Sequence, residues 1–473
     1  MGGAQGDCPL LDHLDAVGAD CALYAEDAMR SAILGMGVTG QSVARYLRTI
    51  GEECCCFDEG ERDNLTADVV VAPFDAALFA TFDRVVVSPG ISWNHAVLQQ
   101  LRNHAQEHGR PELVSDLDLF TANYQGELMA VTGTNGKTTV THLLGVLLET
   151  LAGGVEVGGN IGQPMLDLLG EARRSPRVVL ELSSFQLERS RPPHASWAAL
   201  LNIQEDHVDM HRSSVAYRIA KERIFVEQRA GDYALLPVDG SFDRLAHTLQ
   251  ERGVVVRRFG IGDGVDVGIC GDHLCWYGSS SGAGGGELCR VPLADLKIHG
   301  QHQQCNLAVA AQGAADCGVH TSVIVEGLIS FRGLAHRLQW VARIADHDWF
   351  NDSKATNPAA AAAALVALDR AVWICGGVTK GVDLSPLRSV VRDHVPLMVV
   401  IGRESAPFVA LADSADVAYE VADSMEQAVY LAATLGQQMP VVLSPAAASF
   451  DQFANYAARG DAFVAAVRGL CDA

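Results

Sequence analysis

The residue types of a phosphate-binding loop occur together at one place in the chain, in the run Gly133-Thr134-Asn135-Gly136-Lys137-Thr138-Thr139. The run directly follows the apolar stretch 128–132 and directly precedes a helical pattern, which is where such a loop must lie. Glycines let consecutive backbone N–H groups face a phosphate, and a helix N-terminus adds positive potential. Lys137 can reach the terminal phosphates, and the Thr138 hydroxyl can hold Mg2+. We therefore expect a nucleoside triphosphate here, although Val131 stands where the usual pattern has its first glycine.

A nucleotide loop needs a metal ion, and oxygen-bearing side chains follow two of the later apolar runs. Glu181 lies at the end of the run 178–182, and carboxylates at the ends of parallel strands face the ligand crevice. The next run ends in a polar segment that contains His207, for which a site role is favoured over a structural one. Either Asp206 or Asp209 could accompany it, and the pattern does not choose between them.

A second glycine-rich fingerprint opens the first part of the chain, in Gly35-Met36-Gly37-Val38-Thr39-Gly40, and Asp58 follows it at the end of the next strand. This spacing suits NAD, FAD or any diphosphate placed on a helix N-terminus. Ser88-Pro89-Gly90 would add a loop to the same crevice, or be an ordinary turn. Two phosphate-binding loops in one chain suggest that ATP energy, or a phosphoryl group, is transferred to a second ligand.

The elements that must position these residues follow a βαβ rhythm, which predicts parallel sheets. A length of 473 residues favours about three domains. Expected strands lie at 32–34, 54–57, 85–87, 128–132, 178–182, 198–202, 233–237, 371–375, 397–401 and 441–444. Between 254 and 298 the pattern predicts antiparallel hairpins, with the Gly/Ser run 278–286 as a connector. We expect helices from Gln41, over 358–367 and over 451–468.

The composition is that of a globular protein, with 49% hydrophobic and 19% charged residues. A formal net charge of -22 argues against a surface that binds nucleic acid. The twelve cysteines form no pair of CxxC motifs, so we expect them to be reduced. Neither a secretory leader nor an apolar run of membrane-spanning length is visible, so we expect a cytoplasmic protein with no membrane partner. We also expect the protein to be a monomer.

Four motifs together resemble the Mur ligase family. They are the loop 132–138, the run Gly158-Gly159-Asn160-Ile161-Gly162, the segment 181–188, and Asn351-Asp352-Ser353-Lys354-Ala355-Thr356-Asn357. The resemblance implies an α/β fold with three domains: a Rossmann-like N-terminal domain with a parallel sheet over 1–115 for the UDP substrate, a central P-loop ATPase domain with an antiparallel addition over 116–333, and a Rossmann-like C-terminal domain over 334–473 for the amino acid.

Within the family, the segment 444–453 and the residues that follow it are similar to the D-glutamate-adding members. The resemblance implies an ATP-dependent ligase that adds D-glutamate to UDP-N-acetylmuramoyl-L-alanine through an acyl phosphate. Two alternatives stay open, a sister ligase for another muramoyl peptide or folate polyglutamate, and a P-loop nucleotide switch. The lack of an NKxD guanine motif weighs against the switch.

The resemblance also implies individual roles. ATP would contact the loop 133–139 together with Asn306, Arg337 and Asp352, and two Mg2+ ions would be held by Thr138, Glu181, His207 and a carbamylated Lys221. Catalysis would depend on Lys137, His207 and Lys221. Substrates would contact Gly37, Val38, Thr39, Asp58, Ser88, Pro89, Gly90, Asn160, Ser183, Gln186, His207, Lys354, Thr356, Lys380, Ser449, Phe450 and Tyr456, with His336 shaping the closed site.

A few residues do not fit the local periodicity or the family pattern. Periodicity alone predicts a solvated helix position for Lys221, in contrast to the role that the resemblance implies. Gln303 stands where the family usually has Asn near adenine, and Glu59-Gly60 replace the hydroxyl and arginine usual near uracil.

Overall fold

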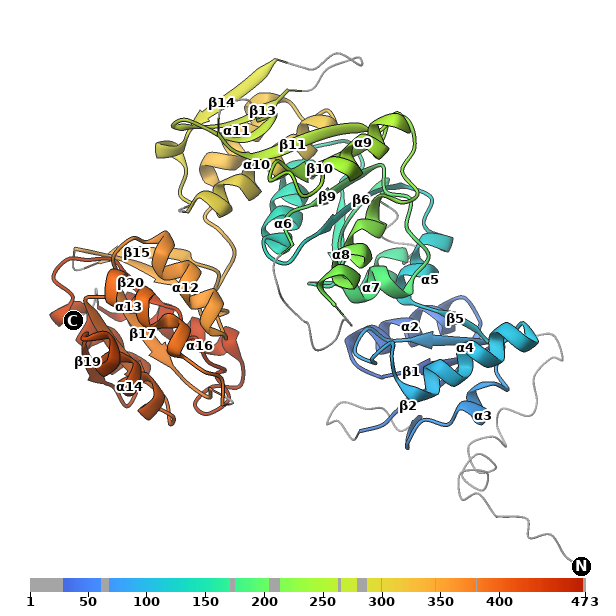
Figure 1. Ribbon diagram of the computed structural model, residues 1–473, viewed down its shortest axis with the longest axis horizontal. Helices are drawn as coiled ribbons and strands as arrows, with labels where there is room; N and C mark the ends of the chain where they lie inside the picture. The colour runs from blue at the N-terminus through green and yellow to red at the C-terminus, as the bar shows by residue number, and fades with distance from the viewer. Residues whose placement is uncertain are drawn as a thin grey trace, which may run out of the picture. The chain divides into compact units, whose positions relative to one another are not determined.

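The computed structural model describes residues 29–60, 68–170, 175–203, 213–262, 265–278, 287–298, 300–344, 346–379 and 381–470 (Figure 1). The described residues of Met1–Thr132, Val155–Ala198 and Ile203–Asp232 form one compact unit, and those of Gly133–Gly154, Ala199–Asn202 and Tyr233–Ala473 form a second. Three sheets organise the described chain, as the α/β prediction requires.

The first sheet is parallel and has the strand order β3-β2-β1-β4-β5. Its strands are β1 (Arg30–Leu34), β2 (Glu53–Asp58), β3 (Val69–Val71), β4 (Arg84–Val87) and β5 (Glu112–Val114). Its helices are α2 (Val38–Thr49), α3 (Ala76–Phe79) and α4 (Ala96–His108). One core packs Phe57 edge-on against Phe79 and Phe82. The strands predicted at 32–34, 54–57 and 85–87 are confirmed, and β1 pairs in parallel with both β2 and β4.

The second sheet has the order β14-β13-β12-β11-β10-β9-β6-β8-β7. Its strands are β6 (Glu127–Thr132), β7 (Glu156–Gly159), β8 (Arg177–Glu181), β9 (Trp197–Leu200), β10 (Tyr233–Pro237), β11 (Val255–Ile261), β12 (Val267–Cys270), β13 (His273–Tyr277) and β14 (Leu288–Pro292). The accompanying helices are α5 (Asp116–Asn123), α6 (Lys137–Leu148), α7 (Ser184–Arg189), α8 (Ser214–Glu222), α9 (Asp243–Glu251), α10 (Gln301–Asp316) and α11 (Thr321–Ser330). Short 3-10 turns occupy η2 (Met165–Leu169), η4 (Arg223–Phe225) and η5 (Leu293–Asp295).

The prediction of antiparallel hairpins between 254 and 298 was wrong for the first strand of that region. β11 pairs in parallel with both β10 and β12, and only the β12–β13 and β13–β14 pairs are antiparallel. Helix α9 leads from β10 to β11 and supplies the crossover that a parallel pair requires. Alternation along β11 does not distinguish these pairings, because side chains alternate in both kinds of sheet.

The third sheet has the order β15-β16-β20-β17-β18-β19. Its strands are β15 (Gln339–Ile344), β16 (His347–Asn351), β17 (Val372–Gly376), β18 (Leu397–Ile401), β19 (Ala418–Val421) and β20 (Val441–Leu443). Its helices are α12 (Pro358–Ala367), α13 (Arg388–His394), α14 (Ala406–Ala415), α15 (Met425–Leu435) and α16 (Tyr456–Gly469), with the 3-10 turn η6 (Ser385–Leu387). β15 and β16 form an antiparallel hairpin, and the remaining pairs are parallel.

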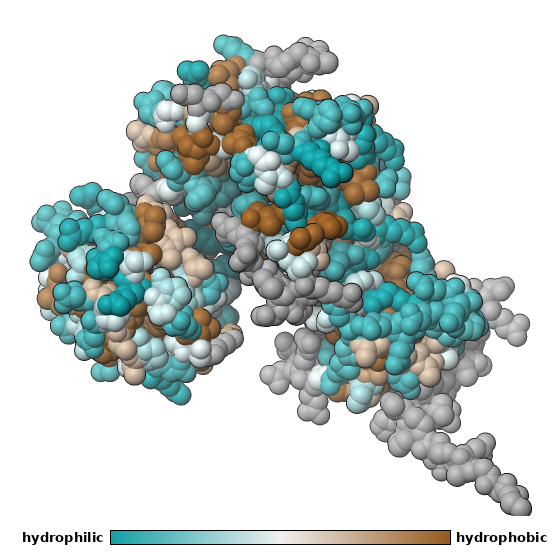
Figure 2. Space-filling model, in the orientation of Figure 1, coloured by the Kyte–Doolittle hydropathy of each residue, from teal (hydrophilic) through white to brown (hydrophobic). Residues whose placement is uncertain are grey.

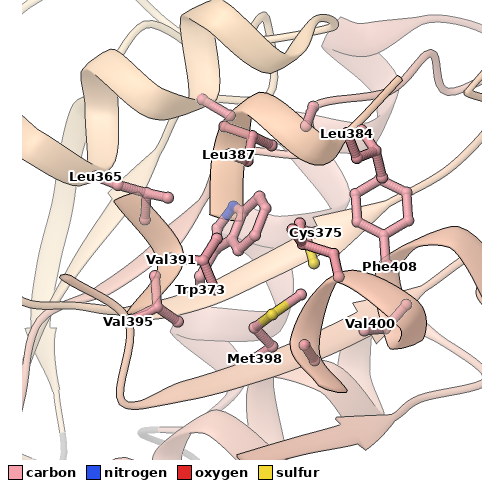
Figure 3. Packing of buried hydrophobic residues seen from close by; sticks show 14 of the residues in the cluster. Leu365, Trp373, Cys375, Leu384, Leu387, Val391, Val395, Met398, Val400 and Phe408 are labelled. Atoms are coloured by element: carbon pink, nitrogen blue, oxygen red, sulfur yellow. The ribbon is translucent and has the colours of Figure 1, made fainter. Parts of the chain in front are cut away.

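Trp373 lies in the core on one side of the third sheet. Its indole packs among aliphatic residues such as Leu387 and Met398, beside Phe408 (Figure 3). The indole N–H donates to the Ser444 carbonyl at 2.7 Å, so the buried donor has a partner. This bond also fixes the start of the loop after β20, which carries several predicted site residues.

Helix boundaries follow the caps that the local sequence supplies. α12 begins at Pro358 as predicted, because Asn357 caps the helix and proline suits its first position. The closing helix begins at Tyr456 and not at Asp451, since Asn455 accepts from the Ala458 N–H and sets the cap later. α2 begins at Val38, three residues before the predicted Gln41.

The visible face is largely hydrophilic, with apolar residues in small separate groups (Figure 2). Exposed large apolar side chains include Val215 and Ile219 on α8 and Phe450 after β20. Of the helices in the described ranges, not one combines the length and the apolar character needed to span a bilayer.

Candidate active site

The predicted phosphate loop joins β6 to α6 and has the backbone form that its glycines allow. Gly133 has φ +154° and Gly136 has φ +86°, and Gly136 is the N-cap of α6 without a side-chain cap. A Cβ on Gly136 would lie 2.6 Å from the side-chain amide of Asn306 on α10. Only glycine therefore lets Asn306 contact the loop so closely, and a helix N-terminus free of a side-chain cap suits an anion.

Asn202, which follows β9, holds this loop in place and was not predicted as a site residue. Its Oδ1 accepts from the Asn135 N–H at 2.9 Å, its Nδ2 donates to the Asn135 carbonyl at 3.0 Å, and its own carbonyl accepts from the Thr134 N–H at 2.9 Å. The signal in the sequence was a polar residue at the carboxyl end of a strand.

Lys137 and Thr138 begin helix α6 and make contacts within the second unit. Lys137 Nζ donates to the carbonyls of Gly133 and Thr134, at 2.9 and 2.8 Å. The Thr138 hydroxyl accepts from Arg337 Nη2 at 2.9 Å, which brings two predicted nucleotide contacts together. Gln303 lies beside them, with its Oε1 3.5 Å from the Thr139 hydroxyl.

Glu181 ends β8, in register with Val131 on the parallel strand β6. The side chain is 2% exposed, and its Oε1 accepts from Asn160 Nδ2 at 3.0 Å. The backbone repeats this link, because the Asn160 N–H donates to the Glu181 carbonyl. Gly159 makes the approach possible, since a Cβ there would lie 2.4 Å from that carbonyl oxygen. A buried carboxylate at a strand end, with an amide on one oxygen, is a suitable hard ligand for Mg2+.

Lys221 lies in the interior, so the solvated position that periodicity predicts was wrong. Its side chain is 1% exposed, its Nζ is 3.5 Å from the Thr132 hydroxyl at the end of β6, and the ammonium lies over the Tyr217 ring. Burial of a lysine head group carries a large desolvation cost, which its contacts must offset. Its predicted neighbour His207 lies outside the described residues.

Ser183 and Gln186, both predicted to contact substrate, form the capping box of α7. Ser183 Oγ accepts from the Gln186 N–H, and Gln186 Oε1 accepts from the Ser183 N–H and hydroxyl. Gln186 Nε2 donates to Asp116 Oδ2 at 3.2 Å. Burial raises the pKa of Asp116 to about 6, partly opposed by this hydrogen bond.

The glycine-rich turn of the first sheet is fixed by Asp58 and Ser88. Asp58 accepts from the backbone N–H groups of Met36 and Gly60, and Ser88 Oγ donates to the Gly35 carbonyl at 2.6 Å. A Cβ on Gly40 would lie 2.0 Å from that same carbonyl, so glycine there permits close packing of helix and turn. The predicted contacts Gly37, Val38 and Thr39 lie at the start of α2, and Pro89 and Gly90 follow β4.

Arg189 at the end of α7 binds the loop after β4 and was missed by sequence reasoning. It is 8% exposed and donates to the carbonyls of Ser88 and Ile91, at 2.7 and 2.6 Å. Burial lowers its pKa to about 10, and Asp116 opposes that shift. A lone helix arginine gave no signal in the sequence, because its partners are backbone atoms about 100 residues away.

Asp352 and Lys354 lie in the segment after β16. Asp352 accepts from the Leu338 N–H at 3.0 Å and from the Ser444 hydroxyl at 2.8 Å, and burial raises its pKa to about 7. Lys354 Nζ donates to Tyr456 Oη at 3.3 Å and lies over the Tyr456 ring. Two predicted amino-acid contacts are thus neighbours.

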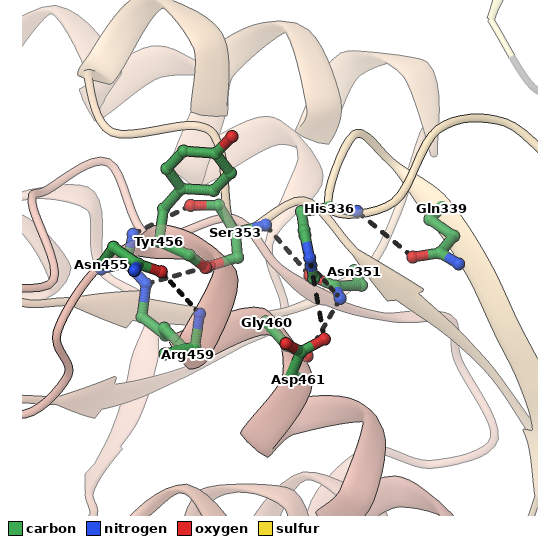
Figure 4. Close-up of polar contacts among 10 residues, drawn as sticks. His336, Gln339, Asn351, Ser353, Asn455, Tyr456, Arg459, Gly460 and Asp461 are labelled. Carbon is green, nitrogen blue, oxygen red and sulfur yellow. Dashed lines mark hydrogen bonds and ion pairs between the residues drawn. The ribbon is translucent and has the colours of Figure 1, made fainter. Parts of the chain in front are cut away.

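His336 faces the start of α16 (Figure 4). Its Nδ1 accepts from Asn351 Nδ2 at 3.0 Å, and its Nε2 is 3.7 Å from Asp461 Oδ1. A Cβ on Gly460 would lie 2.1 Å from His336 Nδ1, so glycine is required there. The His336 backbone, at φ +63°, accepts from the Lys354 N–H.

The remaining predicted residues of the amino-acid site differ in their exposure. Thr356 and Phe450 are exposed, Ser449 is buried at 2% exposure, and Lys380 lies outside the described residues. Among the described residues, there is no group of three or more His, Cys, Asp or Glu side chains that could hold a metal ion.

Lysine is rare in this chain, and most of its lysines are predicted site residues. The chain has five lysines among 35 basic residues, at 137, 221, 297, 354 and 380. All but Lys297 are predicted site residues.

Three family descriptions match successive parts of the chain. The Mur ligase MurD-like N-terminal domain matches residues 29–108, the Mur ligase middle domain matches 131–314, and the Mur ligase glutamate ligase domain matches 336–447.

Proteins called UDP-N-acetylmuramoylalanine--D-glutamate ligase are similar over almost their full length. The relative from Hahella chejuensis is 36% identical, covering 93% of this chain and 98% of its own. The relative from Caulobacter vibrioides is 34% identical, covering 93% and 95%.

Solved structures with low identity share the fold. A MurF ligase from Thermotoga maritima in complex with ADP gives a TM-score of 0.54 at 16% identity, covering 95% of this chain and 97% of its own. The UDP-N-acetylmuramate-alanine ligase MurC from the same organism gives 0.54 at 17% identity, covering 93% and 99%.

Proposed function

We propose that the chain, which belongs to the Mur ligase family, joins D-glutamate to UDP-N-acetylmuramoyl-L-alanine in peptidoglycan precursor synthesis. Members of this family are ATP-dependent amide-forming ligases that use Mg2+. The observation that carries the assignment is the match at 36% identity, over 93% of the chain, to a ligase named for D-glutamate. The predicted D-glutamate segment 444–453 lies within the described residues and folds against α16.

We assign the binding of the three substrates to three domains, with boundaries after Ser115 and Gly333. The first would bind the UDP substrate through the turn 37–39, Asp58 and the loop 88–90. The second would bind ATP and Mg2+ through the loop 133–139 and Glu181, and the third would bind D-glutamate. The Asp58 and Ser88 contacts that shape the first turn support this division.

Phosphorylation is the first step, because a carboxylate is a poor electrophile. An oxygen of the L-alanyl carboxylate attacks the γ-phosphorus of ATP in line, and ADP leaves. Lys137 and the N-terminus of α6 offset the negative charge on the transferred group. Thr138 and Glu181 would hold Mg2+, which supplies further positive charge to the phosphates when bound. The hard oxygen atoms of a hydroxyl and a buried carboxylate fit that ion.

Amide formation follows. The amino group of D-glutamate adds to the acyl carbon, the tetrahedral adduct collapses, and phosphate leaves with the oxygen that joined it to the carbonyl. The amine releases a proton in the same step. Positioning of the amine by the third domain would contribute much of the rate, since orientation can be worth about 7 to 11 kcal/mol. Lys354, Thr356, Lys380, Ser449, Phe450 and Tyr456 would surround the amino acid.

We further propose that Lys221 is carbamylated and, with His207, holds a second Mg2+ ion. Reaction with CO2 needs the neutral amine, and burial at 1% exposure disfavours the ammonium. The carbamate would turn the lysine into an oxygen ligand. A mass increase of one CO2 on the peptide that contains Lys221, lost after acid treatment, is the expected signature. We also propose a cytoplasmic location, where ATP and UDP-linked precursors are available.

One assay tests the amino-acid assignment. The purified protein is incubated with ATP, Mg2+ and UDP-N-acetylmuramoyl-L-alanine, and D-glutamate, L-glutamate or a diamino acid is added separately. D-glutamate alone should drive ADP formation in step with product. Turnover with another amino acid would reassign the chain to a sister ligase. Phosphate release that needs neither the amino acid nor UDP-N-acetylmuramoyl-L-alanine would indicate a nucleotide switch.

A further inference from the structure

Arg459 in the first turn of α16 is a buried cation whose hydrogen bonds all go to uncharged atoms. The residue is 1% exposed, and its guanidinium donates to Ser353 Oγ at 3.0 Å, the Ser353 carbonyl at 2.9 Å and the Ala447 carbonyl at 3.0 Å. Burial lowers its pKa to about 10, and nearby Asp451 opposes the shift. Such a group is costly to bury, so its geometry calls for an explanation beyond packing.

The three bonds join segments that lie far apart in sequence. Ser353 belongs to the segment after β16 and Arg459 to α16 (Figure 4), and Ala447 belongs to the loop after β20. The same loop is tied to its neighbours at Ala446, whose N–H donates to the Ala355 carbonyl, and at Ala448, which pairs with Val378. Arg459 is therefore the point where the three segments meet.

Ser353 extends the network to Tyr456. Its hydroxyl accepts from Arg459 Nε and donates to the Tyr456 carbonyl at 2.7 Å. The Tyr456 ring and hydroxyl in turn contact the Lys354 ammonium, as described above. A chain of contacts thus leads from the buried guanidinium to the half-buried side chains of Tyr456 and Lys354.

We propose that Arg459 is the positioning residue of the amino-acid site, holding Lys354 and Tyr456 in one arrangement that binds D-glutamate. This inference rests on the proposed function. The guanidinium suits the task because its planar fork directs several donors at once, which a lysine amine cannot reproduce. When the residues of the site are already fixed, less side-chain entropy is lost on binding the amino acid, and binding is correspondingly tighter.

The test is steady-state kinetics on the full chain, with each of the three substrates varied. Arg459→Lys keeps the charge and loses the fork, so we expect the KM for D-glutamate to rise about 10-fold or more, while the KM values for ATP and the UDP substrate change less than about two-fold. Ser353→Ala removes one hydrogen-bond acceptor of Arg459, and it should raise the KM for D-glutamate selectively but by a smaller factor. Arg468→Lys, on the exposed end of the same helix, is the matched control and should leave all three unchanged.

A purely structural role would lower the active fraction, so kcat would fall with all KM values constant. That result, or an equal rise for all three substrates, would overturn the proposal. If Arg459→Lys does not fold, Ser353→Ala decides alone, and an unchanged KM for D-glutamate would reject the idea. Wild-type protein without D-glutamate-dependent turnover would instead reject the proposed function.

Discussion

Lys137 is the residue on which phosphoryl transfer should depend most directly. Its Nζ already lies in the phosphate loop, 2.8 Å from the Thr134 carbonyl. Lys137→Met should lower kcat by about 100-fold to 1000-fold, since one charge donor to the transferred group is lost. ADP formation with D-glutamate present measures the effect.

Lys297 provides the control, because it is an exposed lysine outside the proposed site. Lys297→Met should keep wild-type kcat. Equal losses in the two variants would show that lysine content matters only for solubility or stability.

Asp116 should make stability depend on pH. Burial raises its pKa from 3.8 to about 6, so between these values the folded state keeps a proton that the unfolded chain has released. The contribution is fully present below about pH 4 and is lost as the pH rises through about 6, so the free energy of unfolding falls in that window. Asp116→Asn should remove up to about 1.4 kcal/mol per pH unit of that slope.

Urea unfolding of both proteins at several pH values between about 4 and 7 measures this difference. Asp352, whose pKa is raised to about 7, contributes with the same sign in both proteins and cancels from the comparison. Parallel pH profiles for wild type and variant would contradict the assigned burial of Asp116.

Single residues differ in how far sequence could predict them. Gly136, Lys137 and Glu181 could be predicted as site residues because each has a local signal, a glycine-lysine pair or a carboxylate at the end of an apolar run. Asn202 was not predicted as a site residue because its partners are backbone atoms of a segment 67 residues away. Periodicity placed Lys221 in solvent, since one helix pattern does not reveal what packs over it.

Among elements, the phosphate loop is where conformation should matter most. Gly136→Ala would place a Cβ at φ +86° and 2.6 Å from the Asn306 amide, so either the loop or Asn306 must move. A displacement of about 1 Å can cost about 100-fold in rate, and we expect a loss of that order. Turnover and melting temperature, measured together, separate a displaced loop from a destabilised fold.

Gly318→Ala is the matched control, because Gly318 has a similar φ of +90° but open space around its Cβ position. It should lose about 1 to 2 kcal/mol of stability through backbone strain and keep its activity. A Gly136→Ala protein that is no less active than Gly318→Ala would show that the Asn306 contact has no functional importance.

Strands and helices were predictable where local rules decide them. β10 and α12 have their expected bounds because an apolar run and a Pro-capped alanine stretch define them. The direction of β11 was missed because parallel pairing depends on the crossover helix α9 and not on its own residues. The start of α16 was missed because Asn455 caps the helix, which therefore begins at Tyr456 and not at Asp451.

In the molecule as a whole, Arg189 connects two sheets of the first unit, through α7 and the loop after β4. Arg189→Met would remove two charge-assisted hydrogen bonds, each worth about 1.5 to 3 kcal/mol. We expect a lower melting temperature and a KM for the UDP substrate raised about 10-fold or more, because the loop 88–90 would lose its anchor.

Arg191→Met tests the specificity of that effect. Arg191 is 79% exposed and pairs with Glu112 at the surface, a contact worth at most about 1 kcal/mol. Its KM values should match wild type. A shared increase in both variants would point to a general loss of charge near the UDP substrate and not to loop anchoring.

The central claim is that an acyl phosphate carries ATP energy to the amide bond. Its most direct test uses UDP-N-acetylmuramoyl-L-alanine labelled with heavy oxygen in the alanyl carboxylate, incubated with ATP, Mg2+ and D-glutamate. Attack of that carboxylate on the γ-phosphorus predicts that each released phosphate carries one oxygen from the substrate. Phosphate that takes its new oxygen from water, with no label from the carboxylate, would contradict the claim.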